Sequence, residues 1–291
     1  MNKTTKKSTN QSIGAFGEEK VSEYLLAQHY KIIERGARAV VERVCGGGYD
    51  PVKYERIITR IRTIRAEQIL EKIGATGSHF IYPGTDEWPE CLEDLASPPI
   101  TLIIRGDVGL LKSSQLAIVG TRNPTHYGVR VAGDFAAGFV DRGWSITSGG
   151  AYGIDAAAHK GALIAEGSTI AVLAAGIDIN YPAGHARLFA EILESGAIVT
   201  EVMPGVNAIP SRFLTRNRLI AALSNATLVV EAAFRSGSLR TARDAAELLR
   251  PVMAIPGPIN SPTSEGCHRL IGERAAEIVT SVSDAVEFLS I

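Results

Sequence analysis

Residues 116–155 read LAIVGTRNPTHYGVRVAGDFAAGFVDRGWSITSGGAYGID. They hold two short apolar runs, 116–119 and 144–147, separated by a polar loop and by helical spacing over 129–142. The second run leads into a glycine-rich loop. Neither run alternates with polar residues, which is typical of strands buried on both faces of a parallel sheet. Because ligands bind such sheets at the carboxyl ends of the strands, we expect these two loops to hold phosphate groups.

The rest of the chain continues the alternation of strand and helix. Strands joined by helices pair in parallel through right-handed crossovers, so this order predicts an α/β fold, a parallel sheet with helices on both faces. The predicted strands are 116–119, 144–147, 169–173, 197–202, 227–231, 252–255 and 277–280, and the predicted helices are 128–142, 154–166, 184–195, 215–224, 238–249, 266–274 and 283–289.

Composition divides the chain into three parts. Residues 1–11 are basic and polar, and we expect a disordered arm there. Residues 12–77 have helical spacing with an apolar and a basic face, which predicts a small helical domain whose basic face meets water or nucleic acid. Residues 78–291 are the predicted sheet domain. It opens with extended segments, broken by prolines, that we expect to extend the main sheet.

Bulk properties exclude several classes of protein. The net charge is −1, so any nucleic-acid site must be a local patch rather than a basic surface. No apolar run approaches the ~20 residues that cross a membrane, and the N-terminus lacks a signal-peptide core, so we expect a cytoplasmic protein that binds no membrane. The three cysteines are far apart, which supports neither disulfides nor a zinc site, and we expect no metal and no cofactor.

Small and cationic residues follow nearly every predicted strand. Glycine lets an anion approach backbone amides, helix N-termini add partial positive charge, and arginine grips phosphate oxygens with two donors. All these loops are expected at one edge of the sheet. The candidates for binding phosphate or single-stranded DNA are Gly120, Thr121, Arg122, Ser148, Gly149, Gly150, Arg216, Asn217, Arg218, Ser236, Gly237 and Ser238.

Four further polar residues are interpreted as structural support. Asp155 is expected to cap or fix the start of its helix, and His159 to pack behind the glycine loop, although the two could also form an acid–base pair. Glu201 and Glu231 stand at strand ends, where they orient arginines and loop amides or form a carboxylate pair for glycosidic cleavage. The glycine loop matches neither the dinucleotide fingerprint nor the P-loop, so we predict no catalytic residues and no enzyme.

The motifs, taken in order, resemble the DprA/Smf family over about residues 80–288. The resemblance implies an extended Rossmann-like fold after a sterile-alpha-motif-like helical domain. It also implies a homodimer that binds and protects single-stranded DNA and helps load the RecA recombinase during natural transformation. In the family, a pocket around the first-strand arginine holds DNA, which carries over to Arg122, Ser148, Gly149 and Gly150 and, less directly, to Arg216 and Arg218. The motifs are Gly120–Arg122, Ser148–Asp155 with Ala158 and His159, Ala175–Asp178 with Tyr181 and Pro182, Arg216–Ile220, Val229–Ala232 with Ser236–Ser238, and Pro256 with Gly257.

The chain departs from the family pattern at several places. Ala183 and Gly184 stand where many relatives carry a lysine, Arg240 replaces a hydrophobic residue, and His268 replaces an asparagine. We also expect no C-terminal winged-helix domain. Two other functions stay open: a nucleotide-monophosphate phosphoribohydrolase, although the paired glycines of that loop are missing here, and a nucleotide-sensing Rossmann module. Base release from AMP would reveal the enzyme, and oligo(dT) binding compared with free nucleotides would separate the sensor.

Overall fold

The computed structural model describes residues 66–290, and the predicted arm and most of the predicted helical domain lie outside this range. The chain divides into two compact units, residues 1–74 and 75–291. Helix α4 (Ala66–Ala75) ends at this boundary, and every other element described below belongs to the second unit. In the described part of the chain, no helix is long and apolar enough to span a membrane.

Within these residues the strands form one nine-stranded sheet in the order β1-β2-β6-β5-β4-β3-β7-β8-β9. Strands β3 to β9 pair in parallel, as the alternation predicted. The segment predicted to extend the sheet does so as two antiparallel strands, β1 and β2, next to β6. The strands are β1 (His79–Ile81), β2 (Leu102–Gly106), β3 (Gln115–Val119), β4 (Ser145–Ser148), β5 (Thr169–Val172), β6 (Ala197–Thr200), β7 (Ala226–Val229), β8 (Val252–Ala254) and β9 (Glu277–Ile278).

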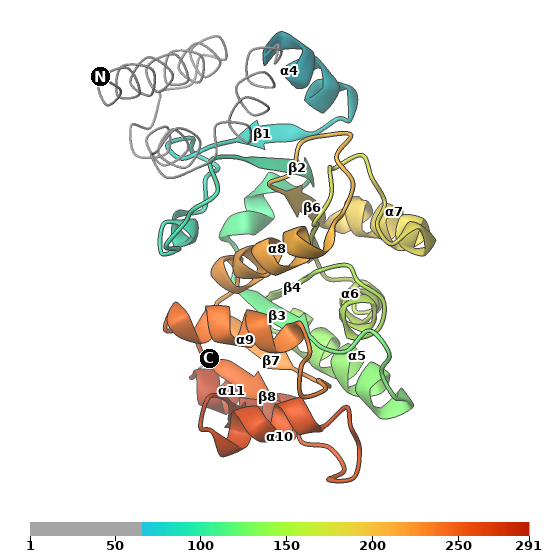
Figure 1. The fold of residues 1–291 in the computed structure, drawn as a ribbon, viewed down its shortest axis with the longest axis vertical. Helices are drawn as coiled ribbons and strands as arrows, with labels where there is room; N and C mark the ends of the chain where they lie inside the picture. The colour runs from blue at the N-terminus through green and yellow to red at the C-terminus, as the bar shows by residue number, and fades with distance from the viewer. Residues whose placement is uncertain (1–65, 291) are drawn as a thin grey trace, which may run out of the picture. The chain divides into compact units, whose positions relative to one another are not determined.

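Helices cover both faces of the sheet (Figure 1). Side chains of α8, α9 and α10 pack with one face, and those of α5, α6 and α11 with the other. The helices are α5 (His126–Val140), α6 (Ile154–Ile164), α7 (Ala186–Ser195), α8 (Pro210–Leu223), α9 (Ser238–Glu247), α10 (Glu265–Gly272) and α11 (Val282–Leu289), with 3-10 turns η1 (Glu90–Leu92), η2 (Val108–Lys112) and η3 (Ala183–His185).

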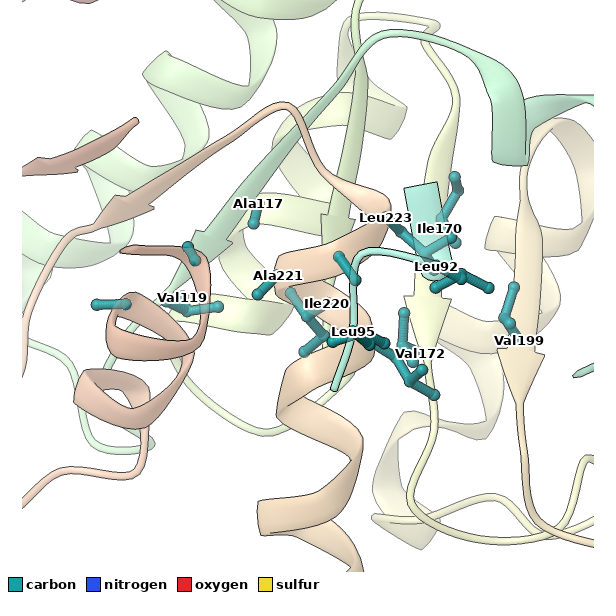
Figure 2. Packing of buried hydrophobic residues seen from close by; sticks show 14 of the residues in the cluster. Leu92, Leu95, Ala117, Val119, Ile170, Val172, Val199, Ile220, Ala221 and Leu223 are labelled. Atoms are coloured by element: carbon teal, nitrogen blue, oxygen red, sulfur yellow. The ribbon is translucent and has the colours of Figure 1, made fainter. Parts of the chain in front are cut away.

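The two faces of β3 supply two separate cores. Ala117 and Val119 join the cluster beneath α8 and α9, whereas Leu116 and Ile118 join the cluster beneath α5 and α6. This is why the run lacks polar residues, since successive strand side chains point to opposite faces and both faces are covered here. Figure 2 shows the first cluster, in which Ile220 and Leu223 of α8 lie with Leu92 and Leu95 against residues of the central strands.

Helix α8 begins five residues earlier than the predicted helix over 215–224. Pro210 occupies its first turn, a position where the missing N–H of proline removes no helical hydrogen bond. The early start brings Phe213 and Arg216 onto one helix, pointing from its first turns toward the carboxyl edge of the sheet. The predicted strand over 277–280 is shorter than expected, because only Glu277 and Ile278 pair with β8.

Helices α5 and α6 approach closely through two glycines, which predicts opposite effects of the same substitution. A Cβ atom on Gly161 would meet the Gly133 carbonyl oxygen at 2.6 Å, whereas a Cβ on Gly133 has nothing within 4 Å. We expect Gly161→Ala to lower the free energy of unfolding by about 2 kcal/mol through overpacking. Gly133→Ala should raise it by up to about 1 kcal/mol through helix propensity. Urea denaturation of both variants measures the difference, and equal effects would contradict this helix contact.

Candidate nucleic-acid interface

The site lies where the order of strands reverses, between β3 and β7. From β3 the chain moves outward through β4, β5 and β6, then returns to β7 on the other side of β3. In parallel sheets this reversal opens a crevice at the carboxyl ends of the strands. The loops after β3 and β7 meet there, because the Thr121 amide donates to the Glu231 carbonyl oxygen at 2.6 Å.

The buried Glu231 carboxylate holds the loop that follows β3. It accepts from the Thr125 amide at 2.9 Å and from the Thr125 hydroxyl at 2.7 Å, and Thr263 donates to it at 3.4 Å. Thr125 in turn caps α5 by accepting from the Gly128 amide. Both carboxylate oxygens of Glu231 are thus hydrogen-bonded inside the fold. Glu231 therefore fixes the position of the loop that carries Arg122.

The glycine loop after β4 packs directly against the same loop. Gly153 has a φ of +86°, and its Cα faces the backbone of Thr121 and Arg122 so closely that no side chain fits. The Ile154 amide donates to the Thr121 carbonyl oxygen at 3.1 Å. The two loops singled out from the sequence therefore form one continuous surface.

The carboxylate of Asp155 lies inside the glycine loop. It accepts from the amide of Gly149 at 3.1 Å and from the amide of Ala151 at 3.3 Å. Asp155 is buried, and desolvation raises the pKa of its carboxyl, opposed by the nearby Arg216 charge. We expected the amides of this loop to face a bound phosphate. The amides of Gly149 and Ala151 do not fit that expectation, because both already donate to the Asp155 side chain.

Arg216 lies under the glycine loop rather than on the surface. Only 5% of the residue is exposed, and its guanidinium stands against the Cα of Gly149, where a methyl group would not fit. It donates to the carbonyl oxygen of Val172, while its buried Nε has no partner in the described chain. Burial lowers the pKa of Arg216 to about 10, so it carries a positive charge at neutral pH. Arg216 therefore places positive charge behind the loop without reaching solvent.

Arg122 is the exposed cation of the site. Its guanidinium carbon lies 5.0 Å from the centre of the Phe213 ring, an arrangement typical of a cation–π contact. Tyr181, which is 45% exposed, adds a second ring, with its centre 5.4 Å from that of Phe213. Among residues 66–290, Arg122 has no ion-pair partner, so its charge is available to a ligand.

The remaining candidates surround this centre and differ in exposure. Arg218 is paired with Glu201 at 2.5 Å, the salt bridge that sequence reasoning kept as an alternative to phosphate binding. Asn217 is buried and donates to the Gly237 carbonyl oxygen at 3.2 Å, which ties α8 to the loop before α9. In that loop the hydroxyls of Ser236 and Ser238 lie 2.7 Å apart.

Ser148 and His159 are fully buried. The Ser148 hydroxyl donates to the Ile118 carbonyl oxygen at 2.6 Å. Thr169 donates its own hydrogen to Ile146, so the His159 Nδ1–H must be the donor in their 2.7 Å contact. Desolvation lowers the pKa of His159 to about 3, which keeps the ring neutral. These side chains shape the floor of the site and do not face solvent.

Sequence comparison identifies the family. The model of the family described as DNA recombination-mediator protein A matches residues 79–290. The chain belongs to the DprA/Smf family. A DNA processing protein DprA from Mycobacterium tuberculosis is 45% identical over 238 residues, which are 77% of this chain and 61% of that relative. The chain therefore spans about three fifths of that relative's length.

Two solved DprA structures resemble this one. The X-ray structure of DprA from Streptococcus pneumoniae is 30% identical, with a TM-score of 0.77 over 99% of this chain and 98% of its own. DprA from Helicobacter pylori, whose structure concerns a unique mode of binding single-stranded DNA, is 30% identical. Its TM-score is 0.67 over 73% of this chain and 95% of its own. The extended Rossmann-like fold expected from the resemblance is confirmed by these neighbours.

Three residues that depart from the DprA pattern make defined contacts in the structure. Gly184 lies under Tyr152, whose hydroxyl oxygen is 2.5 Å from where a Cβ would stand. Arg240 is paired with Asp244 at 2.7 Å, one turn along α9. His268 contacts the Gly257 carbonyl oxygen at 2.9 Å through Nε2 and so holds the loop after β8. No local pattern in the sequence indicates that Tyr181 and Phe213 meet beside Arg122.

Proposed function

We propose that this DprA-family protein binds single-stranded DNA along the carboxyl edge of its sheet and does not cut it. The observation that carries the proposal is the guanidinium of Arg122, which is exposed over Phe213, has no ion-pair partner among residues 66–290 and lies on the surface formed by two glycine-containing loops. A cation beside an aromatic face suits a phosphate next to a stacked base, and such contacts do not depend on sequence. The relative from Helicobacter pylori that binds single-stranded DNA supports the same ligand.

The candidate residues then take different parts. Arg122 contacts phosphate directly, and Phe213 with Tyr181 offers ring faces to bases. Gly120, Gly149 and Gly150 have no room for a side chain, because Ile154, Arg216 and Phe189 fill that space, so these glycines shape the loops above the buried charge of Arg216. Thr121 is half-buried beside Arg122. Ser148, Asp155, His159, Glu201 and Glu231 hold the loops in shape. Asn217, Arg218 and Ser236–Ser238 form the rim of the same site.

Catalysis has no place in this proposal. The Asp155 and Glu231 carboxylates are occupied by backbone amides and hydroxyls, and His159 is neutral and enclosed. General acid–base chemistry needs a group within reach of a bound substrate. Incubation with AMP, followed by measurement of free adenine, should show no release beyond that of a buffer blank.

Membership of the DprA family supports four further proposals. We infer that the protein acts in the cytoplasm as a homodimer, protects incoming single-stranded DNA, and helps load RecA during natural transformation. A dimer would have two such binding edges, and together they would contact a longer strand. Analytical ultracentrifugation measures the dimer, and RecA filament assembly on single-stranded DNA, with and without the protein, measures loading.

The central test is a salt titration of oligo(dT) binding for the wild type and Arg122→Ala. We expect the variant to bind about tenfold more weakly, the equivalent of one charge-assisted hydrogen bond of ~1.5 kcal/mol. Its slope of log affinity against log salt should be flatter by about one unit, because one phosphate contact is lost. Arg142→Ala is the matched control, since Arg142 is exposed beyond the far end of α5. Identical curves for all three proteins would exclude Arg122 from the site.

A further inference from the structure

In two places within residues 66–290 an arginine lies over a phenylalanine ring. One is Arg122 over Phe213, at the centre of the proposed site. The other is Arg269, whose guanidinium carbon is 4.7 Å from the ring centre of Phe234. Phe234 is 47% exposed, although it is a large apolar side chain in a loop between β7 and α9. The second pair thus repeats the construction of the first, with one ring face held by a cation.

Phe234 stands on the same edge of the sheet as Arg122. Its loop starts at Glu231, whose carbonyl oxygen binds the Thr121 amide, and ends at Gly237, whose carbonyl oxygen binds Asn217 of α8. On the other side, the Gly266 amide of α10 donates to Ala232 at 2.8 Å. A backbone hydrogen bond therefore joins the loop that carries Phe234 to the loop that carries Arg122.

The residues that follow Phe234 along the chain carry exposed positive charge. Arg235 and Arg243 are exposed, and the Arg240 side chain is 57% exposed although it is paired with Asp244. Arg269 is paired with Glu273 at 2.6 Å, and this pair keeps its guanidinium over the ring. Glu265, in the first turn of α10, is also exposed and has the opposite charge. A polyanion can therefore approach the open face of the ring with Arg235 beside it.

We propose that Phe234 and Arg235 form a second base-stacking subsite for the same DNA strand that Arg122 holds. This inference rests on the proposed function. An aromatic ring beside arginine, on a basic loop, fits a nucleobase followed by a phosphate, because every base has a flat face to stack. The strand then crosses the topological switch point from the Arg122–Phe213 pair to the Phe234–Arg269 pair. Short strands fill the first subsite only, and longer strands reach both.

The test compares two lengths of oligo(dT), about 6 and about 20 nucleotides, by fluorescence anisotropy. Phe234→Leu keeps an apolar side chain but removes the ring. We expect it to bind the longer strand about tenfold more weakly, as for the loss of one stacked base, and the shorter strand as wild type does. Phe234→Tyr keeps an aromatic ring and should bind the longer strand as tightly as the wild type does. Arg122→Ala should weaken binding of both lengths.

A fluorescent variant gives an independent readout of stacking. In Phe234→Trp, we expect the longer strand to quench the tryptophan emission, and the shorter strand to leave it unchanged. Wild-type affinity of Phe234→Leu for the longer strand, or absence of quenching, would overturn the second subsite while the Arg122 result stands. Failure of the wild type to bind either strand would instead overturn the proposed function, and the subsite with it.

Discussion

Replacing Gly153 with alanine should lower the free energy of unfolding by about 3 kcal/mol, through backbone strain and overpacking together. Gly153 precedes α6 with φ +86° and ψ −126°, a conformation that side chains disfavour. A Cβ there would also stand 2.7 Å from the Arg122 carbonyl carbon and press on the Thr121 carbonyl oxygen. Both obstacles are backbone, so neither can move aside without moving the Arg122 loop.

The measurement is urea denaturation, with oligo(dT) binding under conditions where the variant is folded. We expect binding to weaken as well, because the two loops form one surface. Gly237→Ala is the matched control on the same edge. Gly237 has φ −62° and nothing within 4 Å of a Cβ, so the change in stability should be within about 1 kcal/mol. A Gly153→Ala protein as stable as the wild type would contradict the described contact between the loops.

Acid should destabilise the protein through His159. Burial lowers the pKa of this ring to about 3, from an ordinary value of 6.5. The unfolded chain therefore binds a proton as the pH falls below 6.5, whereas the folded protein keeps the ring neutral. The stability from His159 is complete above pH 6.5 and is lost as the pH falls toward 3. Between about pH 7.5 and about pH 4.5 the loss should reach ~3 kcal/mol.

The structural reason is the packing around the ring. His159 Nε2 is buried and has no hydrogen-bond partner among the residues that the structure describes, and His185 and Arg216 both lie close enough to oppose a positive charge. Asp155 acts in the opposite direction, because burial raises its pKa and the folded protein takes up that proton more readily. The His159 contribution must therefore be isolated by difference. Denaturation of the wild type and of His159→Gln across the pH range gives this difference.

The exposed His126, at the start of α5, supplies the control. We expect His126→Gln to follow the pH profile of the wild type, while His159→Gln loses about 3 kcal/mol less on acidification. An NMR titration gives the direct check, because the His159 ring signals should not move above about pH 4. A midpoint near the ordinary value would show that water reaches the ring.

The two central arginines of the site, Arg122 and Arg216, have different roles. Arg216 is enclosed and bonded to a backbone carbonyl oxygen, so its charge acts over a distance and holds the glycine loop. Arg122 is exposed and unpaired within the described chain, so it can exchange water for phosphate. A buried ion contributes a field at the expense of desolvation, whereas an exposed one contributes counterion release. Salt dependence should therefore report on Arg122.

The fold class and the edge on which the site lies follow from the order of residues alone. Unbroken apolar runs such as 116–119 require burial on two faces, and regular alternation with helices leaves few topologies. The same rule places every loop after a parallel strand at one edge, so Gly120 and Gly149 had to share it. These inferences need only local periodicity, which a sequence records directly.

Which of the candidates are exposed to a ligand depends on contacts made in the folded protein. Arg122, Arg216 and Arg218 are equivalent cations in the sequence, yet one is exposed, one is buried behind Gly149, and one is paired with Glu201. The amides of Gly149 and Ala151 donate to the Asp155 carboxylate within the protein, and the sequence does not show that they are already occupied. Exposure and pairing depend on neighbours far apart along the chain, such as Phe213 beside Arg122, and no local pattern encodes those contacts.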